Sequence, residues 1–200
     1  MKNLIKSNEN STNPEFIPYG TNELMDQMLD IYEYNEEIII AVARLNYGLD
    51  KLIGDSNDVI RAAVAKQGYG LDQLINDESW LVREEVAENG YGLDKLINDS
   101  NSNVRAAVAK QGYGLEELIN DNDELVRIAV AEHNYGLDRL INDSSKYVRL
   151  AIINQGYGLN KFISDNNESD IVNAVNYYLK KNDLTLKQWM EKYPDRVVEK

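Results

Sequence analysis

Apolar and polar positions follow one pattern that recurs every 22 residues along most of this chain. Each unit reads Tyr-Gly-Leu-Asp, a variable residue, Leu-Ile-Asn-Asp, four variable residues, Val-Arg, a variable residue and Ala-Val-Ala. The opening Tyr-Gly pairs lie at residues 47–48, 69–70, 91–92, 113–114, 135–136 and 157–158. A fixed period of this length is typical of a repeat protein, in which each unit buries its apolar face against its neighbours. The pattern therefore predicts one elongated domain with a thin core.

The unit 91–112 shows the two elements that we expect in each repeat. Val104, Ala107 and Val108 have helical spacing, which predicts a helix over Asp99–Gln111. Asp99 is the expected N-cap, because its carboxylate can accept amide hydrogens of the first turn. Leucine and isoleucine at positions 93, 96 and 97 predict a shorter α or 3₁₀ segment over residues 93–98.

The end of the longer helix is specified by a residue that tolerates a left-handed backbone. This position holds only glycine or asparagine: Asn46, Gly68, Gly90, Gly112, Asn134 and Gly156. Small alanines on the same helices should let the helices of adjacent repeats approach closely.

The segment of aspartate, four residues, Val-Arg, two residues and Val-Ala resembles the leucine-rich repeat variant family and is similar to HEAT-type repeats. Its three full copies start at Asp77, Asp99 and Asp121, and the resemblance covers about residues 25–180. It implies a right-handed superhelix, or α-solenoid, in which α-helices alternate with 3₁₀ helices. The iron–sulfur member of the family binds its cluster through a cysteine-rich segment, and this chain has no cysteine. The DNA glycosylases among HEAT-like relatives need a basic groove, and this chain is acidic.

The expected fold is all-α, with about seven repeats that start near residues 25, 47, 69, 91, 113, 135 and 157. Residues 1–20 should form a mobile segment, residues 21–182 the repeat domain, and residues 183–200 a capping helix and tail. The first repeat, 25–46, lacks the Tyr-Gly corner and the arginine, as a capping unit does. We expect the C-terminal helix over residues 184–193, with Asp183 as N-cap and these side chains over the end of the stack: Leu184, Leu186, Trp189, Met190 and Tyr193.

Composition limits the function more by exclusion than by indication. The net charge of −13 argues against a nucleic-acid groove, since phosphates are bound by lysine and arginine. It is consistent with simple solubility or with a basic partner. The N-terminus has no signal-peptide pattern and no segment has a transmembrane pattern, so we expect a cytoplasmic protein. No cofactor, metal or direct membrane contact is expected, and the oligomeric state stays open.

Two evenly spaced ladders run through the repeats. They consist of Arg61, Arg83, Arg105, Arg127 and Arg149, and of Asp55, Asp77, Asp99, Asp121 and Asp143. One interpretation is a basic row for a polyanion. We favour the structural one, in which each arginine pairs with an aspartate at a helix start in its own or the adjacent repeat.

No residue pattern indicates catalysis, so we expect no enzyme. His133 is the only histidine and replaces the amides Gln67, Asn89, Gln111 and Gln155 in other repeats, which favours a hydrogen-bonding role. The corner tyrosines are expected to pack between repeats with the hydroxyl at the edge. An aromatic strip for bases or glycans is the alternative.

The positions that differ most between repeats are the four after the cap aspartate and the one after the arginine. Structure fixes the other positions, so these are free to contact a partner. The candidates are Glu78, Trp80, Glu84, Glu88, Glu124, Lys146 and Tyr147. Trp80 is the best single anchor, because large aromatic residues dominate interface energies. The alternative is that Trp80 covers a seam between repeats.

The resulting hypothesis is a non-enzymatic scaffold that binds another, basic protein through variable helix-start positions. The alternative is an acidic inhibitor that mimics nucleic acid and occupies the groove of a nucleic-acid-processing enzyme. Its acids would be Glu78, Glu84, Glu85, Glu88, Glu116, Glu117, Asp123 and Glu124.

Overall fold

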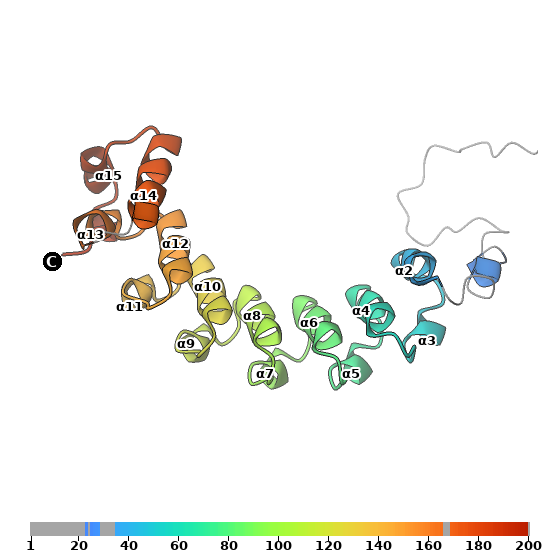
Figure 1. Cartoon of the computed structure of the whole chain (residues 1–200). Helices are drawn as coiled ribbons and strands as arrows, with labels where there is room; N and C mark the ends of the chain where they lie inside the picture. Colours follow the sequence, from blue (N-terminus) through green and yellow to red (C-terminus); the bar gives the residue numbers. More distant parts are fainter. Residues whose placement is uncertain (1–22, 24, 29–34, 166–168, 200) are drawn as a thin grey trace, which may run out of the picture.

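The computed structural model of the chain describes residues 23, 25–28, 35–165 and 169–199, and it contains helices and no strand within these ranges. Longer and shorter helices alternate and form a curved row (Figure 1). This confirms the all-α, repeat-like class expected from the sequence. Residues 1–20, expected to be mobile, lie outside the described residues.

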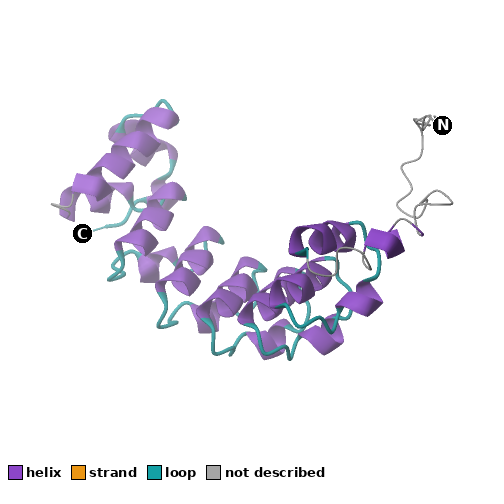
Figure 2. Cartoon of the chain, turned by 45° about the vertical axis from the view of Figure 1, so that its right-hand side comes forward, coloured by secondary structure: helices purple, strands orange, loops and turns teal. Residues whose placement is uncertain are grey.

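The nine-residue helices form the inner side of the curve and the four-residue helices the outer side (Figures 1 and 2). The nine-residue helices are α2 (Glu36–Arg44), α4 (Asp58–Lys66), α6 (Trp80–Glu88), α8 (Ser102–Lys110), α10 (Glu124–Glu132) and α12 (Lys146–Asn154). The four-residue helices are α3 (Leu49–Leu52), α5 (Leu71–Leu74), α7 (Leu93–Leu96), α9 (Leu115–Leu118) and α11 (Leu137–Leu140). Consecutive long helices pack against each other from α2 to α12, and α12 packs against α14.

The core lies between the two rows of helices. Val104, Ala107 and Val108 of α8 are fully buried, as are the valines at the same positions of α6 and α10. Leu96 and Ile97 close the core from the outer side. Because these residues lie on one side of each long helix, its opposite side faces the concave surface of the curve.

The long helices start later than the sequence suggested. Helix α8 runs over Ser102–Lys110, and its N-cap is Asn101, whose side chain accepts the Asn103 amide hydrogen at 2.8 Å. Asn57 and Asp123 cap α4 and α10 in the same way, each at 2.9 Å. Asp99 is therefore not the N-cap, and that prediction was wrong by two residues. Its carboxylate instead accepts the amide hydrogen of Asn101 at 2.9 Å and binds Arg83.

Two left-handed residues make the corner between a long and a short helix. At the corner that follows α6, Gly90 has φ of 72° and Gly92 has φ of 59°. A Cβ added to Gly92 would overlap the Cδ1 atom of Ile75, which belongs to the preceding repeat. The second glycine therefore provides both a backbone angle and the space in which adjacent short helices pack.

The C-terminal end departs from the repeat. Helices α13 (Leu159–Asp165) and α14 (Ser169–Lys181) are longer than their counterparts, and α15 (Leu186–Lys192) follows. The N-cap of α15 is Thr185, in a capping box with Gln188. Asp183 has φ of 53° and ends α14, so its prediction as an N-cap was wrong.

Trp189 of α15 is completely buried, as expected of a capping helix, but Met190 is 37% exposed. A 3₁₀ turn, η1 (Pro194–Arg196), brings the tail back to the corner before α13. There the Gly158 amide donates to the carbonyl of Arg196 at 2.9 Å. The tail therefore helps to close this end of the row.

We expect Gly92→Ala to destabilise the protein strongly. An L-residue in the left-handed region costs about 1–2 kcal/mol, and the overlap with Ile75 adds to that cost. The matched control is Gly54→Ala, because Gly54 has no atom within 4 Å of an added Cβ and no positive φ. Urea unfolding followed by circular dichroism measures both. Equal effects of the two substitutions would contradict this account of the corner.

Candidate functional site

Four of the ladder arginines, Arg61, Arg83, Arg105 and Arg127, each join two repeats. Arg61 donates from Nε and Nη2 to the two carboxylate oxygens of Asp77, at 2.7 and 2.8 Å. Its Nη1 donates to the carbonyls of Asp55 and Ser56, at 2.8 and 3.2 Å. One side chain thus holds its own loop and the loop of the next repeat, and we call this arrangement the arginine clasp.

The clasp recurs with nearly constant geometry. The Nε–Oδ2 distances are 2.6–2.7 Å for the pairs Arg61–Asp77, Arg83–Asp99, Arg105–Asp121 and Arg127–Asp143. Arg149 makes the same bonds from Nη1 to the carbonyls of Asp143 and Ser144. The carboxylate partner lies 16 residues ahead, in the next repeat, and the aspartate six residues behind contributes its carbonyl.

The clasps shift the pKa of both partners. Burial alone would raise the pKa of Asp121, but hydrogen bonds from Arg105 and from the Asp123 amide outweigh burial and leave the pKa below its ordinary value. The carboxylate raises the pKa of Arg105 in turn, against the opposing effect of burial. These guanidinium groups are committed to the fold, which leaves no arginine row for a polyanion among the four clasped residues.

The other edge of the repeats is also bonded across layers. His133 Nε2 donates to the carbonyl of Lys110 at 2.8 Å, and the Gln111 amide donates to the carbonyl of Glu88 at 3.0 Å. The histidine therefore takes the role of the amides that it replaces. Each of these side chains satisfies a carbonyl at the end of the preceding long helix.

The corner tyrosines lie on this edge with part of each ring exposed. Their exposed fractions are 42% for Tyr69, Tyr91 and Tyr113 and 37% for Tyr135. The Tyr135 hydroxyl donates to Glu116 of the preceding repeat at 2.9 Å. Such a contact places the ring against the adjacent layer and the hydroxyl at the surface.

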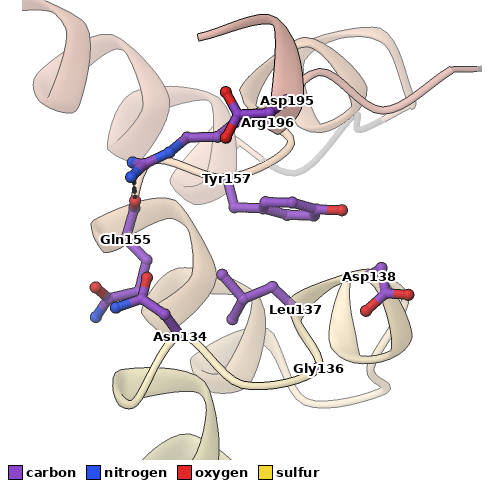
Figure 3. Close-up of a pocket in the computed structure, with 8 residues that line it drawn as sticks. All are labelled: Asn134, Gly136, Leu137, Asp138, Gln155, Tyr157, Asp195 and Arg196. Carbon is purple, nitrogen blue, oxygen red and sulfur yellow. Dashed lines mark hydrogen bonds between the residues drawn. The ribbon is translucent and has the colours of Figure 1, made fainter.

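A polar hollow of about 340 Å³ ends the tyrosine edge near the C-terminus (Figure 3). The Tyr157 ring lies across Leu137, on the same side as Asp138. Burial and the charge of Asp138 raise the pKa of the Tyr157 hydroxyl. Arg196 of the tail reaches over this hollow and donates to the carbonyl of Gln155 at 3.0 Å. The guanidinium group of Arg196 is thus already used to anchor the tail.

The concave surface is formed by positions that the clasps do not use, and the small Ala62 and Ala106 among them are buried. These are the first, second, fifth and ninth residues of each long helix, which the helical period places on one side. In α6 they include Trp80, Glu84 and Glu88, spaced four residues apart. Trp80 is 41% exposed, Glu84 is half-buried and Glu88 is exposed. The structure thus brings three of the sequence candidates into one stripe.

A second part of the concave surface is apolar. Leu125 and Ile128 of α10 lie beside their counterparts Tyr147 and Leu150 of α12, which packs next to it. Leu125 and Tyr147 are 47% and 54% exposed. We call these four residues the apolar patch. Sequence reasoning selected only Tyr147 as a contact, although the other three also occupy variable positions. Ile128 and Leu150 are partly buried against the core, whereas Leu125 is exposed.

The remaining candidates, apart from Glu78, are less available to a partner because they make contacts within the chain. Glu124 accepts a short hydrogen bond from the Ser145 hydroxyl, so it helps to join α10 to the next repeat. Lys146 lies 3.4 Å from Asp170 and 5.4 Å from the centre of the Tyr147 ring. Glu78 is almost fully exposed in the loop before α6, with a carboxylate oxygen 3.9 Å from Arg61 Nη2.

Comparisons of the chain with protein-family models, curated proteins and solved structures find no match. In the described ranges, no group of three or more histidine, cysteine, aspartate or glutamate side chains is placed to hold a metal ion. Within the same ranges, no helix combines the length and the apolar character needed to cross a membrane. The surface itself must therefore indicate the function.

We expect Arg105→Lys to lower the free energy of unfolding by about 2–3 kcal/mol. This is somewhat less than the ~3–5 kcal/mol for breaking a fully buried pair, because the Arg105 side chain is 17% exposed. Lysine keeps the charge but loses the two-pronged geometry. The control is Arg139→Lys, whose pair with Glu116 is exposed and should change stability by at most about 1 kcal/mol. Urea titrations of both variants test this, and similar small effects would argue against the clasp.

Stability should fall in acid because of the clasp aspartates. Their pKa values are lowered in the folded state, so their contribution is full above the unfolded pKa, near 4, and is lost as pH falls through the folded values. Asp121→Asn should reduce this loss, whereas the exposed Asp72→Asn should not. Unfolding midpoints in urea between pH 7 and pH 3 measure the difference. A wild-type midpoint that does not change below pH 4 would refute the account.

Proposed function

We propose that this protein is a non-enzymatic scaffold that binds another protein on the concave surface of its long helices. The observation that carries the proposal is the exposure of Trp80, Leu125 and Tyr147 on one side of a regular fold. Large apolar side chains in this setting are typical of protein-binding surfaces. The residues on this side differ from repeat to repeat, and the clasps lie at another edge of the helices.

The proposed surface is a refinement of the helix-start hypothesis. Trp80, Leu125 and Tyr147 are at the first or second position of their helices, which supports that hypothesis. Glu84 and Ile128 are at the fifth position and extend the surface along the helices. A curved row of rigid helices presents such positions at a fixed spacing, so a partner can be held by shape as well as by charge.

The nucleic-acid-mimicking alternative receives less support. Glu116 and Glu117 belong to the short helix α9 on the outer side, whereas Glu84 and Glu88 lie on the inner side. Glu116 is bonded to Tyr135 and Arg139. The acids proposed as a mimic thus do not form one continuous strip.

The finer architecture remains part of the proposal. We propose a right-handed α-solenoid of the leucine-rich repeat variant type. The supporting observations are the side-by-side packing of consecutive helices and the arginine clasp, which uses the Val-Arg and aspartate positions of the repeat phrase.

A selection from a phage-displayed library of random 16-residue peptides on the immobilised full chain tests the proposal. Selected peptides should lose affinity about ten-fold or more for the variant Leu125→Ser/Tyr147→Ser, as expected for interface anchors. The control Tyr113→Ser removes an aromatic side chain of similar exposure from the opposite edge and should leave affinity unchanged. Circular dichroism confirms that each variant folds.

Two results would count against the scaffold proposal. One is a selection that yields no peptide sensitive to the apolar patch. The other is binding that vanishes between low and high salt and is displaced by DNA or RNA, which would instead favour the mimic.

A further inference from the structure

Helix α6 differs from the other long helices at its fifth and sixth positions. At the fifth position of the long helices the chain has Ala62, Ala106, Ile128 and Leu150, but α6 has Glu84. At the sixth position, α4, α8, α10 and α12 have alanine, but α6 has Glu85. Two adjacent glutamates thus replace small or apolar residues on the half-buried side of one helix.

Only one of the two glutamates has a basic partner for its charge. Glu85 is bound by Lys66 of α4 at 3.0 Å. Glu84 is half-buried, yet it makes no hydrogen bond or ion pair with any residue that the structure describes. Burial raises the pKa of Glu84, and the Glu88 charge raises it further, while Lys110 and Lys66 oppose the shift only from a distance. A half-buried carboxylate without a partner is unfavourable for the free protein.

Trp80 completes a surface suited to a cation. It precedes Glu84 by four residues, so the two side chains are neighbours on the helix. The indole is 41% exposed. An arginine or lysine of a partner can lie on an aromatic face while it binds a carboxylate.

The charges around this pair favour a cation as well. Trp80 is the first and Glu84 the middle residue of α6, and the adjacent helices α4 and α8 begin with Asp58 and Ser102. Lys66 and Lys110 are the last residues of α4 and α8 and lie at the other end of the helices. Glu78 precedes Trp80 by two residues, and Asp58 accepts a hydrogen bond from the Ser79 hydroxyl, so both carboxylates add negative charge near Trp80. Arg61, 3.9 Å from Glu78, is already bound to Asp77.

The apolar patch lies on the same half of the surface, two helices away. Helices α6, α8 and α10 are consecutive, and packed helices are about 8–10 Å apart, so the distance from Glu84 to the patch is roughly 16–20 Å. Between them α8 presents Ser102, Asn103 and the small Ala106. A partner can cross α8 without meeting a large side chain.

We infer that the concave surface binds a partner segment with an arginine or lysine at one end and apolar side chains at the other. The basic group contacts Trp80 and Glu84, and the apolar side chains contact the apolar patch. The two ends are separated by about 11–13 residues if the segment is helical, or about 5–6 residues if it is extended. This inference rests on the proposed function and adds the chemistry of the partner.

The test uses the peptides selected from the 16-residue library on the full chain. They should carry a basic residue and an apolar group at one of these two separations. Fluorescence anisotropy of one labelled peptide should show a loss of about ten-fold or more for Trp80→Ala and for Glu84→Gln. The control Glu117→Gln, on the outer side, should bind as the wild type does.

A double-mutant cycle identifies the contact. Replacing the basic residue of the peptide with glutamine should weaken binding to the wild type, but should weaken binding to Glu84→Gln much less. Glu84→Gln should also keep or raise the urea midpoint, because it removes an unpaired half-buried charge. A loss of binding therefore cannot be attributed to unfolding.

The outcomes separate the inference from the proposed function. If peptides need the apolar patch but contain no basic residue or do not respond to Glu84→Gln, the inference is wrong and the scaffold proposal stands. If peptides respond to neither the patch nor α6, both are wrong. Peptides that respond to both, with coupling between their basic residue and Glu84, support both.

Discussion

The clasp between an arginine and the aspartate 16 residues ahead is the constraint on which the rest of this structure depends. One guanidinium group binds two carbonyls of its own loop and both carboxylate oxygens of an aspartate in the next repeat, as Arg61 does with Asp55, Ser56 and Asp77. The same carboxylate also accepts the amide hydrogen of the next N-cap residue. The start of each long helix is thereby fixed relative to its neighbour at a part-buried, fully bonded site.

This constraint explains how the fold divides its surface. The clasps hold the helix-start edge, and the amides and His133 hold the opposite edge through carbonyls of the preceding repeat. The left-handed glycines let the short helices approach on the outer side. With both edges and the outer side committed to stability, the concave surface of the long helices is free to carry the variable residues. The proposed binding surface follows from this division of roles.

Helix α6 shows what such freedom permits. The clasp of Arg83 with Asp99 and the buried Val82 and Val86 keep this helix in register, so the outward positions can hold Trp80 and Glu84 despite their cost to stability. A repeat protein tolerates local exceptions of this kind because each layer is held by its neighbours. A residue such as Glu84, which lowers stability and has no bonding partner in the fold, therefore indicates function more strongly than the regular positions do.

The sequence by itself determined the local elements of this protein. The period of 22 residues, the buried stripe of Val104, Ala107 and Val108, and the left-handed corner glycines were all readable, because they depend on contacts that recur in every repeat. The tertiary structure decided what depends on side-chain direction between repeats. The sequence suggested Asp99 as an N-cap because capping preferences depend on local sequence. In the structure, Arg83 of the preceding repeat binds the Asp99 carboxylate, and Asn101 is the N-cap. The grouping of Leu125, Ile128, Tyr147 and Leu150 into one patch likewise required adjacent helices to be packed side by side, since residues 22 apart in sequence become neighbours only then.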